Sequence, residues 1–295
     1  FQVRGKVPRH SMKAREVRIP AALVDAVVVD ATQRQGYDLV YDAALSGQDR
    51  RDDPEPPQPA FSSRLVIARR AQQELHDNAV INFGFGIPDQ IAKLIDRDGH
   101  AERYFQTIEH GTYGGRLMDG DLFGYAMNPS CMIDGPSQFD FYSGGGLDIA
   151  FLGFGEIDAA GNVNVSKLGG NTVGPGGFID IAQNARKVVF CGTFDTGGAR
   201  LETGDGTLRV TSHGRIPKLV EKVDQITFSG PQASVQGQHV IYVTERAVFE
   251  LREDGVHLVE IAPGIDLQAD VLERMGFTPR MESPLSEMNS GLFKE

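Results

Sequence analysis

The sequence predicts an α/β protein built on an open, mostly parallel sheet with helices on both faces. Short apolar runs without alternation, such as 147–152 and 187–191, recur along the chain with helical patterns between them. Apolar and polar residues alternate only in 239–261, which predicts antiparallel strands at one edge of the sheet toward the C-terminus. Glycine-rich turns follow several of the predicted strands, where parallel sheets commonly bind ligands.

The predicted elements follow one another in a regular order after residue 60. Ser62 or Ser63 is placed to cap a helix through Leu75, because apolar residues recur there at helical spacing. Asp266 is placed to cap a last helix through Met275. Between them we expect strands at 79–83, 104–108, 147–152 and 187–191 and helices at 89–95 and 177–184.

The first sixty residues differ from the rest of the chain. No glycine-rich turn or helical repeat closes a core there, and residues 52–59 (DDPEPPQP) hold four prolines in eight positions. Prolines at this density exclude a helix or a central strand and favour an exposed connector. We therefore predict a boundary that separates 1–60 from 61–295, with an irregular loop inside a single domain as the alternative.

Composition narrows the possible functions. The 295 residues include 29 Lys and Arg against 40 Asp and Glu, so the formal net charge is −11. An acidic chain repels phosphate backbones, which argues against a nucleic-acid-binding protein. Two cysteines cannot build a disulfide framework, and no run of about 18 apolar residues predicts a membrane helix. We expect a cytoplasmic protein with no membrane or nucleic-acid partner.

The first candidate motif is the glycine turn at 84–88 (GFGIP), between a predicted strand and a predicted helix. Backbone N–H groups at such a turn favour a phosphate or an oxyanion. A dinucleotide fingerprint would need a glycine at position 89, where the chain has Asp89, so that interpretation is weak. A purely structural turn remains the alternative. The motif consists of Gly84, Phe85, Gly86, Ile87 and Pro88.

The second candidate motif places a carboxylate at the end of a predicted strand. Glu109 follows the strand at 104–108, and glycines stand at positions 111, 114 and 115. These glycines allow a ligand to approach the backbone closely, which favours a functional glutamate over a solvated loop acid. His110 adjoins Glu109, but consecutive strand residues point to opposite faces, so both need not contact one ligand.

The third candidate motif is the glycine run 174–177, which leads into the helix predicted at 177–184. Its free N–H groups can face the same sheet edge as Glu109. Glu156 and Asp158, earlier in the segment, are a conceivable metal pair, but no histidine is near and a role in a turn is favoured.

Other polar residues carry weaker signals. His213 stands beside a serine, but the chain lacks a nucleophile elbow, so we interpret His213 as a loop residue. Four cations are candidate partners for a ligand phosphate, with a solvated surface position as the alternative for each: Arg116, Lys167, Arg186 and Lys187.

Taken together, four segments in order resemble the catalytic half of the family I coenzyme A transferases: 82–88 (NFGFGIP), 108–115 (IEHGTYGG), 147–169 and 174–194. The resemblance is strongest to the C-terminal half of single-chain short-chain acyl-CoA transferases that use acetate or propionate. Residues 17–47 resemble the stretch that joins the two halves of those enzymes.

This resemblance implies a site and a reaction. Glu109 matches the catalytic glutamate, which attacks an acyl-CoA to give a mixed anhydride and then a glutamyl-CoA thioester. His110 departs from the asparagine of the ketoacid-using members, which makes a 3-ketoacid donor less favoured. Coenzyme A is then a substrate, with no permanently bound cofactor and no metal. The backbone elements around the thioester match Gly84, Phe85, Gly86, Ile87, Pro88, Gly176, Gly177 and Phe178.

The resemblance also implies partners. An acyl-CoA and a short-chain carboxylic acid are the expected ligands, and a homo-oligomer is expected. Residues 1–60 would be the tail of an N-terminal CoA-transferase domain plus a linker, and that domain would be supplied as a separate or cleaved chain. Two alternatives stay open: an acyl-transfer subunit of a citrate-lyase-like complex, which would need a thioester carrier protein, and a non-catalytic CoA-binding module.

Overall fold

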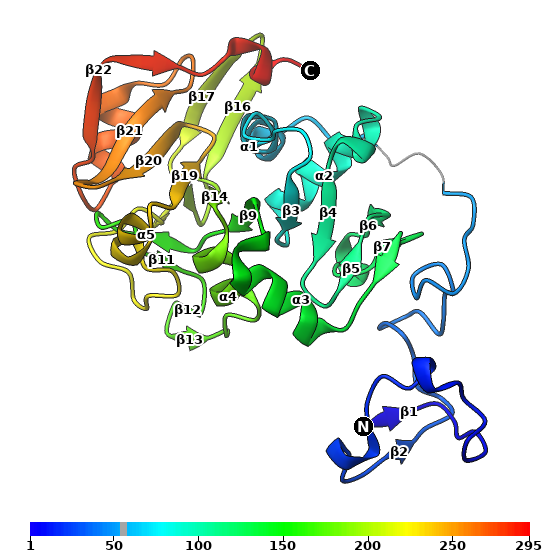
Figure 1. Ribbon diagram of the computed structural model, residues 1–295. Coiled ribbons are helices and arrows are strands. Elements are labelled where there is room, and N and C mark those ends of the chain that lie inside the picture. Colours follow the sequence, from blue (N-terminus) through cyan, green and yellow to red (C-terminus); the bar gives the residue numbers. More distant parts are fainter. Residues whose placement is uncertain (54–57) are drawn as a thin grey trace.

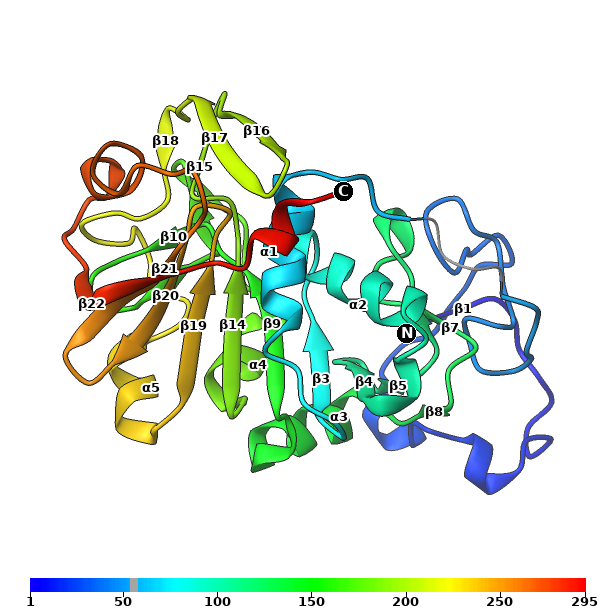
Figure 2. The ribbon, with the colours of Figure 1, turned by 90° about the horizontal axis from the view of Figure 1, so that it is seen from above.

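A ten-stranded mixed sheet lies at the centre of the computed structural model, which describes residues 1–53 and 58–295. Across the sheet the strands follow the order β22-β21-β20-β19-β14-β9-β3-β4-β5-β8 (Figures 1 and 2). All four strands predicted before residue 200 belong to it. The strands are β3 (Val80–Phe83), β4 (Phe105–Ile108), β5 (Thr112–Tyr113), β8 (Cys131–Met132), β9 (Ile149–Gly153), β14 (Lys187–Cys191), β19 (His239–Val243), β20 (Ala247–Arg252), β21 (Gly255–Ile261) and β22 (Arg280–Glu287).

The five central strands, β4, β3, β9, β14 and β19, are parallel. Both faces of this part of the sheet are covered, so successive side chains of one strand enter different cores. In β9, Ile149 and Phe151 pack into one hydrophobic cluster, whereas Ala150 and Leu152 pack into the other. Burial on both faces explains why these strands are continuous apolar runs, and it confirms the predicted fold class.

Helices cover the two faces. In Figure 1, α1 (Ser63–Gln72) and α2 (Ile87–Arg97) lie on one side, and α3 (Gly135–Phe141), α4 (Phe178–Asn184) and α5 (Gly230–Gln236) lie on the other. The Ser62 hydroxyl accepts a hydrogen bond from the Leu65 N–H, which confirms the predicted cap of α1. Regular α-helix ends at Gln72, and Leu75 closes a tighter turn through a bond from its N–H to the Gln72 carbonyl.

The edges of the sheet differ in part from the sequence prediction. Antiparallel pairing at the C-terminal edge joins β19 to β20 and β20 to β21, but β19 itself pairs in parallel with β14. The added edge strand β22 is parallel to β21 and was not predicted. At the other edge, the short strands β5 and β8 are antiparallel to their neighbours. They were also missed, because two-residue strands give no periodicity.

The segment after β21 is helical, but it is neither one α-helix nor the last element. The Asp266 carboxylate accepts a bond from the Ala269 N–H, as predicted for a cap. A π-turn (Leu267–Val271) and a 3₁₀ turn (Leu272–Arg274) replace the expected helix. Strand β22 and a 3₁₀ turn (Ser290–Phe293) follow, so the prediction of a last helix was wrong.

None of the helices in 1–53 and 58–295 is long and apolar enough to cross a membrane.

Several short two-stranded sheets lie outside the central sheet. The pairs are β6 (Arg116–Leu117) with β7 (Ala126–Met127), β10 (Glu156–Ile157) with β11 (Val163–Asn164), β12 (Lys167–Leu168) with β13 (Asn171–Thr172), β15 (Asp195–Thr196) with β18 (Ile216–Pro217), and β16 (Arg200–Gly204) with β17 (Thr207–Ser212).

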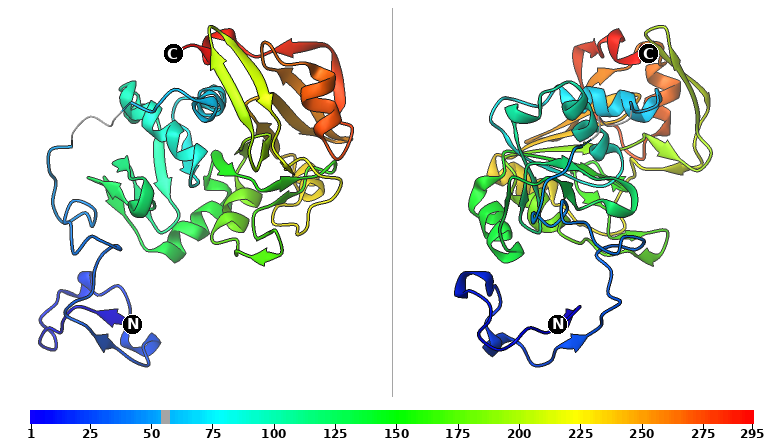
Figure 3. Two further views of the ribbon diagram at one scale, coloured as in Figure 1. Left: turned by 180° about the vertical axis from the view of Figure 1, so that it is seen from behind. Right: turned by 90° about the vertical axis from the view of Figure 1, so that its right-hand side faces the viewer.

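Residues 1–34 lie away from the sheet (Figures 1 and 3) and contain one strand pair, β1 (Gln2–Val3) with β2 (Val28–Val29). The first buried apolar side chains of the chain are Ala44 and Leu45, which pack near Met127 of β7. Residues 35–53 therefore attach to the main body before the predicted boundary near residue 60. The predicted proline connector falls partly on residues 54–57, which lie outside the described residues.

Candidate active site

Glu109 lies directly after β4, at the edge where the parallel strands end. The turn that holds it depends on Gly111, which has φ +108°. A Cβ at this position would lie 2.2 Å from the Ile133 carbonyl oxygen, so only glycine fits between the two chain segments. The Gly111 N–H bonds the Ile108 carbonyl, and the Ile133 N–H bonds the Gly111 carbonyl. The glycine two residues after Glu109 thus fixes the position of the glutamate.

A buried chain of hydrogen bonds runs from the Ile81 carbonyl to the Glu109 carboxylate. The Thr107 hydroxyl donates to the Ile81 carbonyl at 2.8 Å, so the Tyr142 hydroxyl, 2.6 Å from Thr107 Oγ1, donates to that oxygen. Asn82 Nδ2 then donates both to the Tyr142 oxygen and to Glu109 Oε2, at 3.4 Å in each case. This chain orients one carboxylate oxygen of Glu109.

Tyr142 remains a neutral donor in this arrangement. Its side chain is fully buried, and burial is the main reason that the pKa of Tyr142 is raised to about 12. The Glu109 charge acts in the same direction as burial, and the hydrogen bonds with Thr107 and Asn82 act against it. Sequence reasoning missed both Asn82 and Tyr142. An asparagine inside the apolar strand 79–83 was an available signal, whereas Tyr142 lies 33 positions after Glu109 and had none.

A cavity of about 300 Å³ opens in front of Glu109. It gathers three separate parts of the chain: the turn after β3, the end of β9 and the glycine run before α4. A Cβ on Gly177 would lie 3.5 Å from the Glu109 Cγ, so the glycine run adjoins the Glu109 side chain. Five of the predicted backbone residues line this cavity with Glu109: Gly84, Phe85, Gly176, Gly177 and Phe178.

The other three predicted backbone residues do not line the cavity. Gly86 caps α2 with φ +97°, and its N–H is bound by the Asp89 carboxylate at 3.1 Å. Ile87 belongs to the hydrophobic core, and Pro88 is buried in the first turn of α2. These three residues therefore join the turn at Phe85 to the start of α2 and do not face the cavity.

Free backbone donors are found at the second glycine run. The Gly84 N–H is already bonded to the Phe151 carbonyl, so it cannot serve a ligand. Among the described residues, the N–H groups of Gly176 and Gly177 have no acceptor, and both glycines face the cavity. They are the donors that an oxyanion beside Glu109 can use.

The remaining sequence candidates lie elsewhere. His110 is exposed, and its ring packs edge-on against Tyr125. His213 contacts Arg246 and Asp270 rather than the cavity. Asp158 accepts backbone bonds from 160 and 162, which agrees with the predicted turn role. Across 1–53 and 58–295, no cluster of three His, Cys, Asp or Glu side chains could hold a metal ion.

All four cations considered as phosphate partners form ion pairs within the chain. Arg116 pairs with Asp53 at 2.9 Å, which also ties the N-terminal segment to β6. The other pairs are Lys167 with Asp224, Arg186 with Asp148 and Lys187 with Glu74. None of these four lines the Glu109 cavity.

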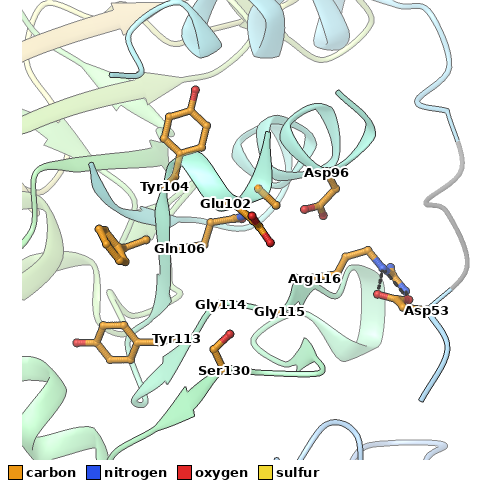
Figure 4. Close-up of a pocket in the computed structure, with 12 residues that line it drawn as sticks. Asp53, Asp96, Glu102, Tyr104, Gln106, Tyr113, Gly114, Gly115, Arg116 and Ser130 are labelled. Atoms are coloured by element: carbon orange, nitrogen blue, oxygen red, sulfur yellow. Dashed lines mark hydrogen bonds and ion pairs between the residues drawn. The ribbon is translucent and has the colours of Figure 1, made fainter. Parts of the chain in front are cut away.

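A larger cavity of about 550 Å³ lies near the start of β4 and does not contain Glu109. Figure 4 shows Asp96 and Gln106 directed toward its centre and the Arg116–Asp53 pair at its side. Asp96 Oδ2 and Gln106 Oε1 are buried without a hydrogen-bond partner. Burial, the main cause, raises the pKa of Asp96 to about 6.

Comparisons with known proteins relate this chain to CoA-transferases. No protein-family model matches the chain. Among characterised proteins, acetate CoA-transferase YdiF of Escherichia coli O157:H7 is 43% identical over 294 residues, which cover 99% of this chain and 55% of YdiF. Caffeate CoA-transferase of Acetobacterium woodii is 42% identical over 302 aligned positions, covering 100% of this chain and 57% of that protein.

Solved structures agree with this relationship. The crystal structure of the YdiF acyl-CoA transferase in a thioester complex with CoA matches with a TM-score of 0.88 and 43% identity, over 99% of this chain and 55% of that chain. Glutaconate CoA-transferase from Acidaminococcus fermentans matches at 18% identity and a TM-score of 0.59, which shows a shared fold alone. The chain is thus related to CoA-transferases along its whole length, and it spans 55–57% of the length of the two curated relatives.

Proposed function

We propose that this chain carries the catalytic glutamate of an enzyme that transfers coenzyme A from a short-chain acyl-CoA to a carboxylic acid such as acetate or propionate. The observation that carries the proposal is the position of Glu109, which accepts a hydrogen bond from Asn82 and lies beside the glycine run that has free N–H groups. The identity to an acetate CoA-transferase over almost the whole chain supports it.

The proposed reaction proceeds through covalent intermediates on Glu109. A Glu109 carboxylate oxygen attacks the acyl-CoA carbonyl carbon, the C–S bond breaks, and a mixed anhydride and a CoA thiolate result. The thiolate then attacks the glutamyl carbonyl, releases the first acid as a carboxylate and leaves a glutamyl-CoA thioester. An acceptor carboxylate runs the two steps in reverse and leaves as its own CoA ester.

The residues around Glu109 have defined roles in this scheme. Each attack forms a tetrahedral oxyanion, and the Gly176 and Gly177 N–H groups are placed to donate to it. Loss of one such donor in other acyl-transfer enzymes costs about 2.7–4 kcal/mol. Asn82 restricts the Glu109 carboxylate to one orientation, which lowers the entropic cost of attack.

We further propose that the chain acts together with an N-terminal CoA-transferase half in a cytoplasmic oligomer, with residues 1–60 joining the two. Support comes from the share of each relative that the chain covers and from apolar side chains left exposed in the N-terminal segment, such as Leu23 at 69% and Val28 at 61%. Coenzyme A is a substrate in this proposal, and no metal takes part.

Trapping of the glutamyl adduct tests the mechanism. The intact enzyme is incubated with acetyl-CoA, treated with borohydride or hydroxylamine, and mapped by mass spectrometry, with a mass change expected at Glu109. Glu109→Ala should lose the adduct and at least about 10³-fold of the turnover while CoA binding persists. Glu102→Gln, at an exposed position before β4, is the matched control and should keep both.

An unmodified Glu109 in an active enzyme would exclude this mechanism. Full activity of Glu109→Ala would favour a non-catalytic CoA-binding module instead. Activity that requires a thioester carrier protein and fails with free CoA esters would favour the citrate-lyase-like subunit.

A further inference from the structure

The cavity of about 550 Å³ near the start of β4 is separate from the cavity in front of Glu109. None of the described residues lines both cavities. Gln106, which lines the larger one, stands three positions before Glu109, about 10 Å away in an extended chain. Pockets for small ligands enclose about 300–1,000 Å³, whereas one water molecule takes about 30 Å³. The larger cavity therefore has room for an organic ligand.

Two hydrogen-bond acceptors from different elements face this cavity. Asp96 stands near the C-terminal end of α2 and Gln106 in β4, and Figure 4 shows both side chains directed toward the centre of the cavity. Gln106 is only 8% exposed. Among the described residues, the buried atoms Asp96 Oδ2 and Gln106 Oε1 have no hydrogen-bond partner. Because buried acceptors without donors are unfavourable, a ligand that donates N–H bonds to them is favoured.

Regular pairing fixes the position of Gln106. It pairs with Ile81 in the register of β3 and β4, and its carbonyl accepts a bond from the Gly114 N–H at 2.8 Å. Gly114 and Gly115 also line the cavity, with φ values of +63° and +75° that favour glycine. The two glycines add no side chain to the cavity, so space remains in front of an acceptor whose backbone is held in the sheet.

The charges around the cavity favour a cationic ligand. Arg116 also lines the cavity, but it is paired with Asp53 at 2.9 Å. Asp96 forms no ion pair with any described residue, and its pKa of about 6 leaves it mainly ionised at pH 7.5. An ionised Asp96 has no proton to donate to Gln106, so both acceptors stay unsatisfied. A cationic N–H donor would satisfy them and offset the buried charge.

We propose that this cavity binds the ammonium or guanidinium group of an organic cation through Asp96 and Gln106. A guanidinium presents a planar fork of donors, and an ammonium presents a compact charge with three donors. The site is distinct from the CoA transfer proposed above and does not involve Glu109.

Equilibrium binding to the enzyme that contains both halves tests the site. Calorimetric titration at pH 7.5 compares butylguanidinium with butylurea, which has nearly the same shape and no charge. We expect butylguanidinium to bind at least about tenfold more tightly. Asp96→Asn and Gln106→Met keep side-chain bulk and should each weaken butylguanidinium binding by about tenfold or more.

A control variant separates this site from general surface charge. Asp121→Asn removes the same charge at an exposed position outside the cavity and should leave butylguanidinium binding unchanged. Circular dichroism establishes that each variant is folded. Equal affinity for butylguanidinium and butylurea, unchanged binding in a folded Asp96→Asn protein, or an equal loss in Asp121→Asn would overturn the proposal.

A lysine or arginine side chain of the N-terminal half carries the same chemistry as a free ligand. Butylguanidinium binding to the enzyme with both halves identifies a free ligand. If only this chain alone binds butylguanidinium, weaker association of the N-terminal half with the Asp96→Asn chain identifies a side chain of that half. Association unchanged by Asp96→Asn in that case, or no binding to either form, would overturn the proposal.

Discussion

At the scale of single residues, the cost of a buried charge is clearest at Asp96, near the C-terminal end of α2. Its Oδ2 atom is buried without a partner, and burial raises the pKa of Asp96 to about 6, although the Arg116 charge and Gln106 act in the opposite direction. Below pH about 4 the carboxyl is protonated in both the folded and the unfolded protein, so it costs nothing. As the pH rises through 6, the folded protein must hold a buried carboxylate.

We therefore expect Asp96→Asn to increase the free energy of unfolding by about 1–3 kcal/mol at pH 7.5 and to change it little at pH 4. Urea unfolding followed by circular dichroism at several pH values measures the difference. Asp121→Asn, at an exposed position, is the control and should show no such trend. A stabilisation by Asp96→Asn that is equal at both pH values would contradict the explanation.

Residues also differ in how readily the sequence identifies them as part of the candidate site. Glu109 and the glycines near it form a local pattern, so adjacent positions were enough to propose them as one site. Asn82, Thr107 and Tyr142 form one hydrogen-bonded chain from three different segments. Only the pairing of β3 with β4 and the approach of the segment around Tyr142 bring them together.

At the scale of elements, Gly111 in the turn between β4 and β5 links the position of Glu109 to the stability of the fold. Its φ of +108° and the 2.2 Å approach of the Ile133 carbonyl to a hypothetical Cβ exclude any side chain. An alanine there must push β8 away or twist the turn, and either movement displaces Glu109. The glycine is thus required for backbone geometry rather than for direct ligand contact.

We expect Gly111→Ala to lower the free energy of unfolding by about 2–4 kcal/mol and to reduce turnover at least about tenfold. Thermal unfolding and steady-state kinetics measure the two effects. Gly144→Ala is the matched control, because a Cβ at Gly144 meets no atom within 4 Å and its φ is ordinary for an L-residue. A Gly111→Ala protein with the stability and turnover of the Gly144→Ala control would contradict this role.

Elements were predictable when their pattern was long enough to repeat. The central strands and the start of α1 follow from apolar runs and from the Ser62 cap. Strands of two residues such as β5 and β8 carry no period, and β22 joins the sheet only because β21 presents a free edge. The order of the strands likewise depends on packing between segments far apart in the sequence.

At the scale of the whole molecule, the N-terminal segment leaves several large apolar side chains exposed to solvent. Val7, Val17 and Leu23 are 63%, 51% and 69% exposed. Covering such surface contributes about 25 cal/mol per Å², which favours a partner surface over solvent. In the arrangement proposed above, the N-terminal half would cover this surface.

We expect the chain alone to show no CoA transfer and to regain it on association with an N-terminal CoA-transferase half. Native size analysis followed by activity measurement of each peak tests this expectation. A Glu109→Ala chain mixed with the same half is the control, since it should associate without turnover. A 32.1 kDa monomer with full activity would contradict the two-part arrangement.

The sequence alone determined the fold class, the catalytic candidate Glu109 and the glycine run at 174–177, because each is encoded by neighbouring residues and by ordered motifs. The tertiary structure decided which glycines keep free N–H groups, which residues orient Glu109, and which cations form ion pairs with acids. Those properties depend on hydrogen-bond and ion-pair partners from distant segments, and a linear pattern does not specify which partner each group will meet.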